Sequence, residues 1–178
     1  MKIYVIGGKA KSGKNTLGER IKYHLIEKGH YPCIMRITEP LYNYAKTYFQ
    51  YNEKIDKKPR EFLQNMGIEI IQKKMGKKNF LLNRLFEDIE ILNNFFDTFI
   101  ITDARLINEF KTIKEKYKDA VIIKLERENY NDELTETEKK HITELEIEKY
   151  NNYNYLIKNT SLKQLDKAAK DIVEKENY

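Results

Sequence analysis

The chain has 178 residues, of which 40% are hydrophobic and 34% are charged, and its formal net charge is +5. This length predicts one domain, and no apolar run reaches the roughly 18 residues that a transmembrane helix needs. The positive charge indicates a lysine-rich solvated surface rather than nucleic-acid binding, because no nucleic-acid-binding module accompanies it. The single cysteine, Cys33, excludes an internal disulfide and suits a reducing cytoplasm.

Short apolar runs rich in β-branched residues alternate with longer amphipathic segments along the chain. The runs expected to form strands are 3–6, 31–37, 98–102, 120–126 and 154–159. The segments expected to form helices are 14–29, 40–51, 60–75, 79–96, 107–117, the charged stretch 135–150 and the C-terminal end. This alternation predicts an α/β fold, in which helices cover both faces of a five-stranded parallel sheet. Right-handed crossovers then bring the loops after the strands to one edge.

Residues 6–16 read IGGKAKSGKNT and nearly match the phosphate-loop pattern G-x-x-x-x-G-K-[ST]. Glycines let consecutive backbone N–H groups converge on an anion, and the following helix N-terminus favours negative charge. Lys14 supplies a movable positive charge for the outer phosphates. The residues expected to hold the phosphates of ATP are Gly8, Lys11, Ser12, Gly13, Lys14, Asn15 and Thr16.

The loop departs from the usual pattern at Asn15, where a Ser or Thr hydroxyl normally coordinates Mg²⁺. An asparagine offers an amide oxygen to the metal or holds a metal-bound water. Thr16, one position later, is placed to bond an inner phosphate. We therefore expect phosphate binding with Mg²⁺ held less directly.

The third predicted strand ends at Asp103, and Arg105 follows two residues later. A carboxylate on a rigid strand end suits Mg²⁺, directly or through a water, and a guanidinium makes a forked contact with a phosphate. The alternative is that Asp103 caps the next helix and pairs with Arg105.

Several segments resemble one family. GGKAKSGKNT resembles the phosphate loop of the phage and bacterial deoxynucleoside monophosphate kinases, which commonly reads G-K-x-x-S-G-K-D-T, and animal-type phosphomevalonate kinases have a similar loop. DARLINE (103–109) resembles the family's D-x-R-F-x-N-E segment. The resemblance implies a single adenylate-kinase-like domain over 1–178, with three α/β/α layers, acceptor-binding helices over about 39–96 and a lid over about 127–146. It also implies ATP and Mg²⁺ as cofactors.

The resemblance extends to the predicted acceptor region. Glu39 stands where the family has the Asp of F-A-D-P-L-K, and Arg60 and Gln64 match R-x-x-L-Q-x-x-G-x-E. It implies that Arg60 and Arg105 grip the acceptor phosphate, that Gln64 pairs with a base edge and that Glu39 faces the acceptor. Arg127 is the cation expected to close with the lid over the transferring group.

The predicted reaction is ATP-dependent phosphorylation of a nucleoside or deoxynucleoside monophosphate, with Lys14, Asp103, Arg105 and Arg127 as catalytic residues. The alternatives are a kinase for another phosphorylated metabolite, such as phosphomevalonate or dephospho-coenzyme A, and a nucleotide-binding protein without catalysis. A GTPase-type switch is disfavoured, because neither D-x-x-G after the third strand nor N-K-x-D is present. The expected partner is a small nucleotide rather than a nucleic acid or a membrane, and a homodimer is left open.

Overall fold

The structure is a computed structural model that describes residues 1–127 and 142–176. Within these residues, five strands form one parallel sheet in the order β2-β3-β1-β4-β5. The strands are β1 (Lys2–Gly7), β2 (Pro32–Met35), β3 (Thr98–Ala104), β4 (Val121–Arg127) and β5 (Tyr155–Asn159). The five predicted strands and their parallel arrangement are therefore confirmed.

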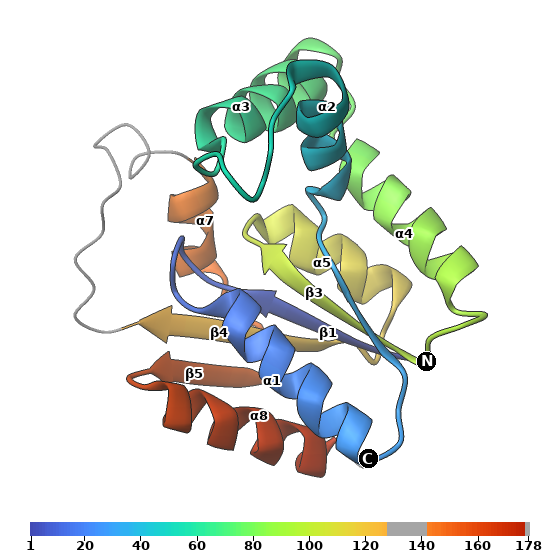
Figure 1. Cartoon of the computed structure of the whole chain (residues 1–178), viewed down its shortest axis with the longest axis vertical. Coiled ribbons are helices and arrows are strands. Elements are labelled where there is room, and N and C mark those ends of the chain that lie inside the picture. Colours follow the sequence, from blue (N-terminus) through green and yellow to red (C-terminus); the bar gives the residue numbers. More distant parts are fainter. Residues whose placement is uncertain (128–141, 177–178) are drawn as a thin grey trace.

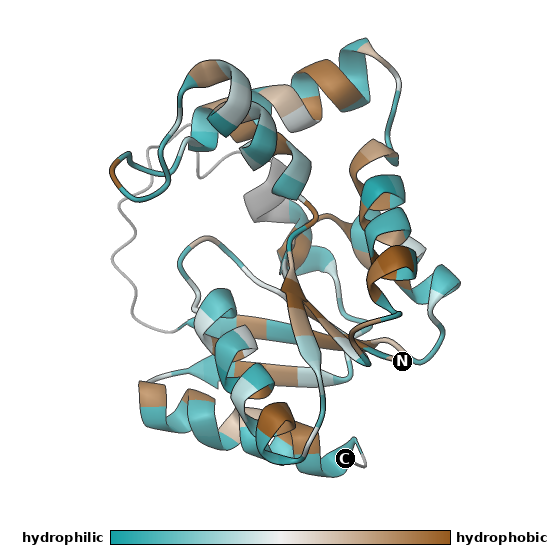
Figure 2. Cartoon of the chain, turned by 45° about the vertical axis from the view of Figure 1, so that its right-hand side comes forward, coloured by the Kyte–Doolittle hydropathy of each residue, from teal (hydrophilic) through white to brown (hydrophobic). Residues whose placement is uncertain are grey.

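Helices cover both faces of this sheet, as predicted (Figure 1). On one face, α1 (Lys14–Glu27) lies against α8 (Leu162–Lys175), and their inward residues share a core with β1 and β4. On the other face, α4 (Phe80–Leu92), α5 (Ile107–Lys116) and α7 (Ile142–Lys149) contribute to a second core. The central strand β1 divides its side chains between the two cores, because successive residues point to opposite faces. Figure 2 shows the brown, hydrophobic residues along these strands, while much of the outer helical surface is teal.

A separate group of helices stands above the sheet in Figure 1. It contains α2 (Glu39–Phe49), α3 (Arg60–Gln64) and the continuation of α3 as a π-helical segment, η1 (Asn65–Lys74). The sequence predicted one helix over 60–75, and the structure differs because most of it has the wider π-helical hydrogen bonding, which is rare and often found at functional sites. This group makes up the first part of the acceptor region predicted over about 39–96, whose last part, α4, lies against the sheet.

The loops that follow the strands meet at one edge of the sheet, as the topology predicted. Asp103 near the end of β3 accepts hydrogen bonds from the segment after β2, and Arg127 at the end of β4 donates to the carbonyl of Lys11 after β1. Asn159, the last residue of β5, donates to Ser12 of the same loop. None of the helices in the described part of the chain has the length and apolar character needed to cross a membrane.

Candidate functional site

The predicted phosphate loop runs from the end of β1 into the N-terminus of α1. Lys14, the first residue of α1, exposes only 7% of its surface, and its Nζ donates to the carbonyls of Gly8 at 2.7 Å and Lys9 at 2.6 Å. The ammonium group therefore lies inside the curve of the loop. A phosphate bound in the loop would compete with these two carbonyls for the Lys14 ammonium group.

Two glycines of the loop are required by close backbone packing. A Cβ on Gly8 would come within 2.4 Å of the carbonyl oxygen of Leu125 in β4. Gly13 has a φ of +102°, and a Cβ there would approach the Asn159 Nδ2 to 2.6 Å. Only glycine fits both positions without a shift of the backbone or of the Asn159 amide. The pattern that predicted Gly8 and Gly13 is thus explained by packing as well as by conformation.

The loop contains a polar group that suits an incoming anion. The Ser12 side chain is buried, and its Oγ has no hydrogen-bond partner in the part of the chain that the structure describes. A buried hydroxyl without a partner costs about 1–3 kcal/mol, and a phosphate oxygen that accepts a hydrogen bond from it would offset this cost. Together with the Lys14 ammonium and the start of α1, this arrangement fits the phosphates of a nucleotide.

Asn15 and Thr16 lie in the first turn of α1. Asn15 is exposed and Thr16 is partly exposed, and both border a shallow depression along the outer side of α1. Both polar side chains are therefore accessible from solvent at the mouth of the loop. Their predicted roles toward Mg²⁺ and an inner phosphate remain predictions.

Asp103 ties β3 to the start of α2. Its carboxylate accepts hydrogen bonds from the backbone N–H of Ile37 at 2.8 Å and of Thr38 at 3.1 Å, and from the Thr38 hydroxyl at 2.5 Å. The sequence had allowed Asp103 to cap the helix that follows it, but the carboxylate instead reaches the N-terminus of α2. Oδ2 accepts two of these hydrogen bonds and Oδ1 accepts one, so Oδ1 keeps one acceptor position for Mg²⁺ or its water.

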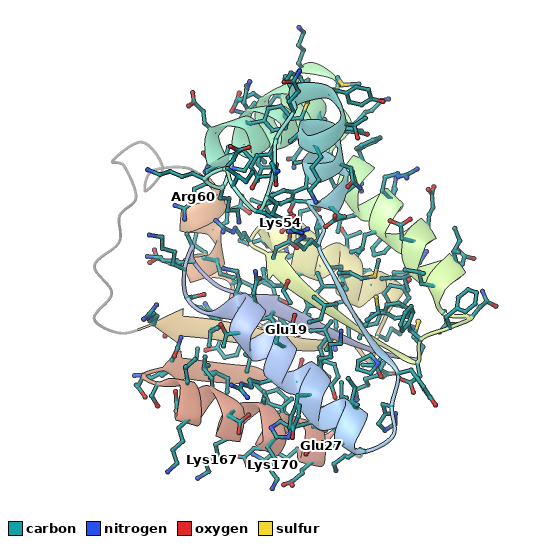
Figure 3. All side chains as sticks on the ribbon, in the orientation of Figure 1. Glu19, Glu27, Lys54, Arg60, Lys167 and Lys170 are labelled. Atoms are coloured by element: carbon teal, nitrogen blue, oxygen red, sulfur yellow. The ribbon has the colours of Figure 1, made fainter. Side chains whose placement is uncertain are left out.

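A cleft of about 800 Å³, counted out to its open mouth, lies between the upper helices and the sheet edge. Three cations line it, namely Lys58, Arg60 and Arg105, together with the carboxylates of Asp103 and Glu109. Figure 3 shows Arg60 at the lower end of α3, where the upper helices face the sheet. The predicted pairing of Arg60 with Arg105 around one site is consistent with this lining.

The rest of the cleft combines side-chain amides with apolar walls. Gln64 and Gln72 both line it, and within residues 1–127 and 142–176 no group bonds their amides. The apolar walls are formed by Leu41, Leu63, Ile68, Leu81 and Leu106. Such a surface suits a flat ligand with a polar edge. Ala10 of the phosphate loop lines the same cleft, so the loop and the cleft adjoin.

Two groups that line the cleft, Glu109 and Lys58, have shifted pKa values, and burial is the main cause of both shifts. Burial raises the pKa of Glu109 to about 7, although its Oε2 accepts hydrogen bonds from the backbone N–H groups of Arg105 at 2.7 Å and Leu106 at 2.9 Å. The pKa of the Lys58 ammonium is lowered, first by its withdrawal from solvent and then by the charge of Arg105. An anion bound in the cleft would favour the charged form of Lys58.

Two sequence-predicted residues lie away from the cleft lining. Glu39, expected to face the acceptor, instead accepts a 2.6 Å hydrogen bond from the Nε of Arg36, and the cleft is lined without it. Arg127 is exposed, and its Nη1 donates to the Lys11 carbonyl at 3.3 Å, which places it against the phosphate loop.

Most of the predicted lid, residues 128–141, lies outside the described residues. The chain returns in α7, beside the phosphate loop and the start of α5. Glu148 pairs with Lys9 of the loop, and the Glu146 carboxylate accepts a 2.9 Å hydrogen bond from the Ile107 backbone N–H. The helix expected at the end of the charged stretch is confirmed over 142–149.

Sequence reasoning missed three residues of this region, which are Asn159, Lys58 and Gln72. Asn159 ends a predicted strand, so its place at the ligand edge offered a signal. Gln72 follows Gln64 by two intervals of four residues, which is helical spacing for a shared face. Lys58 stands in a charged loop, IDKKPR, and nothing local distinguishes it from Lys57.

Comparisons with solved structures agree with this architecture. A shikimate kinase from Bacteroides thetaiotaomicron has a TM-score of 0.57 and 14% sequence identity over 99% of both chains. A shikimate kinase from Aquifex aeolicus has a TM-score of 0.55 and 16% identity, covering 99% of this chain and 98% of that one. No protein-family model and no curated protein matches the sequence. These comparisons do not confirm the resemblance to deoxynucleoside monophosphate kinases. They establish the P-loop kinase fold.

Proposed function

We propose that this protein transfers the γ-phosphoryl group of ATP to a nucleoside or deoxynucleoside monophosphate. The observation that carries the proposal is the shared boundary between the phosphate loop and the cationic cleft. Ala10 of the loop lines the same cleft as Arg60 and Arg105. A donor phosphate in the loop and an acceptor phosphate among the cations would therefore be neighbours, as direct phosphoryl transfer requires.

The donor side is served by groups of the loop. Lys14 and the Ser12 hydroxyl would bind phosphate oxygens, and the loop N–H groups would complete the cradle. Mg²⁺ bound with ATP supplies neutralisation of the charge on the transferring group. Asn15 at the loop mouth and Asp103 at the strand end are the residues that would hold this ion, directly or through water.

The acceptor side is served by the cleft. Arg60 and Arg105 would orient the acceptor phosphate, while Gln64 and Gln72 offer amides to a base edge between apolar walls. An acceptor phosphate oxygen attacks the γ-phosphorus, the bond to the β–γ bridging oxygen breaks, and ADP leaves. This acceptor oxygen is already ionised near neutral pH, so the reaction needs no dedicated general base. Positioning of the two phosphates and neutralisation of their charge would accelerate it.

Two alternatives compete with this proposal. The cationic cleft would also suit another phosphorylated metabolite, and the structural neighbours are named for a kinase of shikimate, an acceptor without a phosphate. The second alternative is a protein that binds a nucleotide without catalysis, because Asn15 replaces the hydroxyl residue that usually coordinates Mg²⁺. The amides of Gln64 and Gln72 favour an acceptor with a polar ring edge over one without it.

The test is ADP release, coupled to a spectrophotometric readout, with ATP, Mg²⁺ and a panel of acceptors. The panel contains the common nucleoside and deoxynucleoside monophosphates, phosphomevalonate, dephospho-coenzyme A and shikimate. Turnover that depends on a nucleoside monophosphate supports the proposal. Turnover with shikimate alone, or ATP binding with no turnover across the panel, would overturn it. A Lys14→Ala preparation controls for contaminating kinases.

A further inference from the structure

Lys58 is a cation of the cleft that no sequence motif identified. It lies in the loop before α3 and lines the cleft with Arg60 and Arg105. The backbone N–H of Arg60 donates to the Lys58 carbonyl at 2.9 Å, and Pro59 between them restricts the backbone. Lys58 and Arg60 are therefore presented by one tight turn at the start of α3, so their positions are coupled.

The ammonium group of Lys58 has no ion-pair partner within residues 1–127 and 142–176. Its Nζ lies 5.9 Å from the centroid of the Tyr42 ring. Asp103 attracts it from a distance, but both carboxylate oxygens of Asp103 already accept hydrogen bonds from the start of α2. Lys58 is thus a cation whose charge is not neutralised by a direct contact in this part of the chain.

The environment of Lys58 disfavours its charged form. Withdrawal of the ammonium group from solvent lowers the pKa of Lys58 most, although the residue as a whole is exposed. The charges of Arg105, Arg60 and Arg36 lower this pKa further, while Asp103 opposes them. A cluster of like charges around one cleft is a feature of functional sites, where a ligand of opposite charge offsets the repulsion. The repulsion among these cations would be relieved most by a ligand with more than one negative charge.

We propose that Lys58 is a specificity-determining residue, which binds the phosphate of a phosphomonoester acceptor and selects it over a monocarboxylate. The inference rests on the proposed function and deepens it. A phosphomonoester carries a charge of about −1.5 to −2 near neutral pH and has three acceptor oxygens, whereas a carboxylate carries one charge on two oxygens. Arg60 and Arg105 would make forked contacts with the phosphate oxygens. Lys58 would add a point charge that offsets the second negative charge of the phosphate.

The experiment compares Lys58→Met with the matched control Lys57→Met. Lys57 and Lys58 are both exposed, but the cleft is lined by Lys58 and not by Lys57. Steady-state kinetics are measured with ATP and the best nucleoside monophosphate of the panel, each varied separately. We expect Lys58→Met to raise the acceptor KM at least tenfold while the ATP KM changes less than twofold. Lys57→Met should behave as the unmodified protein, and Lys58→Arg should recover part of the loss.

A second measurement isolates the charge of the acceptor. The 5′-sulfate of the same nucleoside has one negative charge in place of nearly two, and it is used as a competitive inhibitor. Lys58→Met should weaken inhibition by the sulfate less than it raises the KM of the phosphate, because the lost contact serves the second charge. A merely structural role for Lys58 would weaken both ligands and ATP together.

The outcomes separate this inference from the proposed function. If the unmodified protein turns over a nucleoside monophosphate but Lys58→Met matches Lys57→Met, the role of Lys58 is wrong and the kinase assignment stands. Effects of equal size in the two variants would reflect the general surface charge and not a contact made by Lys58. If the unmodified protein acts only on an acceptor without a phosphate, the proposed function and the inference both fail.

Discussion

The side-chain amide of Asn159, at the end of β5, donates a 2.8 Å hydrogen bond to the backbone carbonyl of Ser12 in the phosphate loop. Both partners are buried, and the same amide fills the space beside Gly13 that a Cβ would need. Residues 147 positions apart are therefore joined at the point where the loop turns into α1. The edge strand β5 therefore contacts the loop that follows the central strand β1.

We predict that Asn159→Ala weakens ATP binding while the protein remains folded. The Ser12 carbonyl would lose its buried donor, which costs about 1–3 kcal/mol and corresponds to roughly a fivefold to hundredfold rise in the ATP dissociation constant if it falls on the bound loop. Nucleotide titration measures this change, with Asn151→Ala at an exposed position as the control. Equal ATP affinities for the two variants would show that the loop keeps its shape without Asn159.

Lys14→Ala should abolish turnover with the fold intact. The ammonium lies inside the loop on the carbonyls of Gly8 and Lys9, so its removal takes the positive charge from the donor phosphates. Thermal unfolding verifies the fold, and the control is Lys167→Ala on α8, which Figure 3 labels on the side away from the upper helices. Unchanged activity in Lys14→Ala would refute the assignment of residues 8–16 as a phosphate loop.

Asp103→Ala should reduce stability and also raise the Mg²⁺ concentration needed for half-maximal turnover. The stability loss is expected at about 2–4 kcal/mol, because three hydrogen bonds to a carboxylate disappear. Thr38→Val is the control, since it removes only the hydroxyl donor and should cost about 1 kcal/mol without moving the Mg²⁺ dependence. Urea unfolding and Mg²⁺ titration of the rate measure the two effects. An Mg²⁺ dependence unchanged in Asp103→Ala would mean that the carboxylate only ties β3 to α2.

Glu109 should make stability fall as the pH rises toward neutrality. Its pKa rises from 4.5 to about 7 on folding, chiefly through burial and with a smaller contribution from Asp103. A raised carboxyl pKa means that the folded protein holds an extra proton, so the stabilising contribution is complete below the unfolded value and is lost as the pH passes through the folded one. The loss could reach roughly 3 kcal/mol at about 1.4 kcal/mol per unit.

The comparison that tests this linkage is Glu109→Gln against the unmodified protein, by urea unfolding from about pH 5 to about pH 8. Glutamine keeps an acceptor oxygen for the backbone N–H groups of Arg105 and Leu106 but does not titrate. The free-energy difference should therefore shift in favour of the glutamine variant as the pH rises. Glu115→Gln, at an exposed position of α5, is the control. A difference that stays constant across this range would contradict the raised pKa.

Local sequence patterns determined the elements of this fold. The apolar runs around residues 3–6 and 98–102 mark strands buried on both faces, and the amphipathic segments between them mark crossover helices. The phosphate loop was equally readable, because its backbone conformation and its anion chemistry both depend on residues within one short stretch. These features follow from interactions between near neighbours in the chain.

The tertiary structure decided the features that depend on distant partners. It showed that Asp103 bonds the start of α2 rather than α5, that Glu39 pairs with Arg36, and that Asn159 holds the loop. It also separated Lys58 from Lys57, which are chemically identical in the sequence and differ only in which one reaches the cleft. Sequence periodicity sets which face of an element is buried, but the choice of partner across that face comes from packing between segments far apart in the chain.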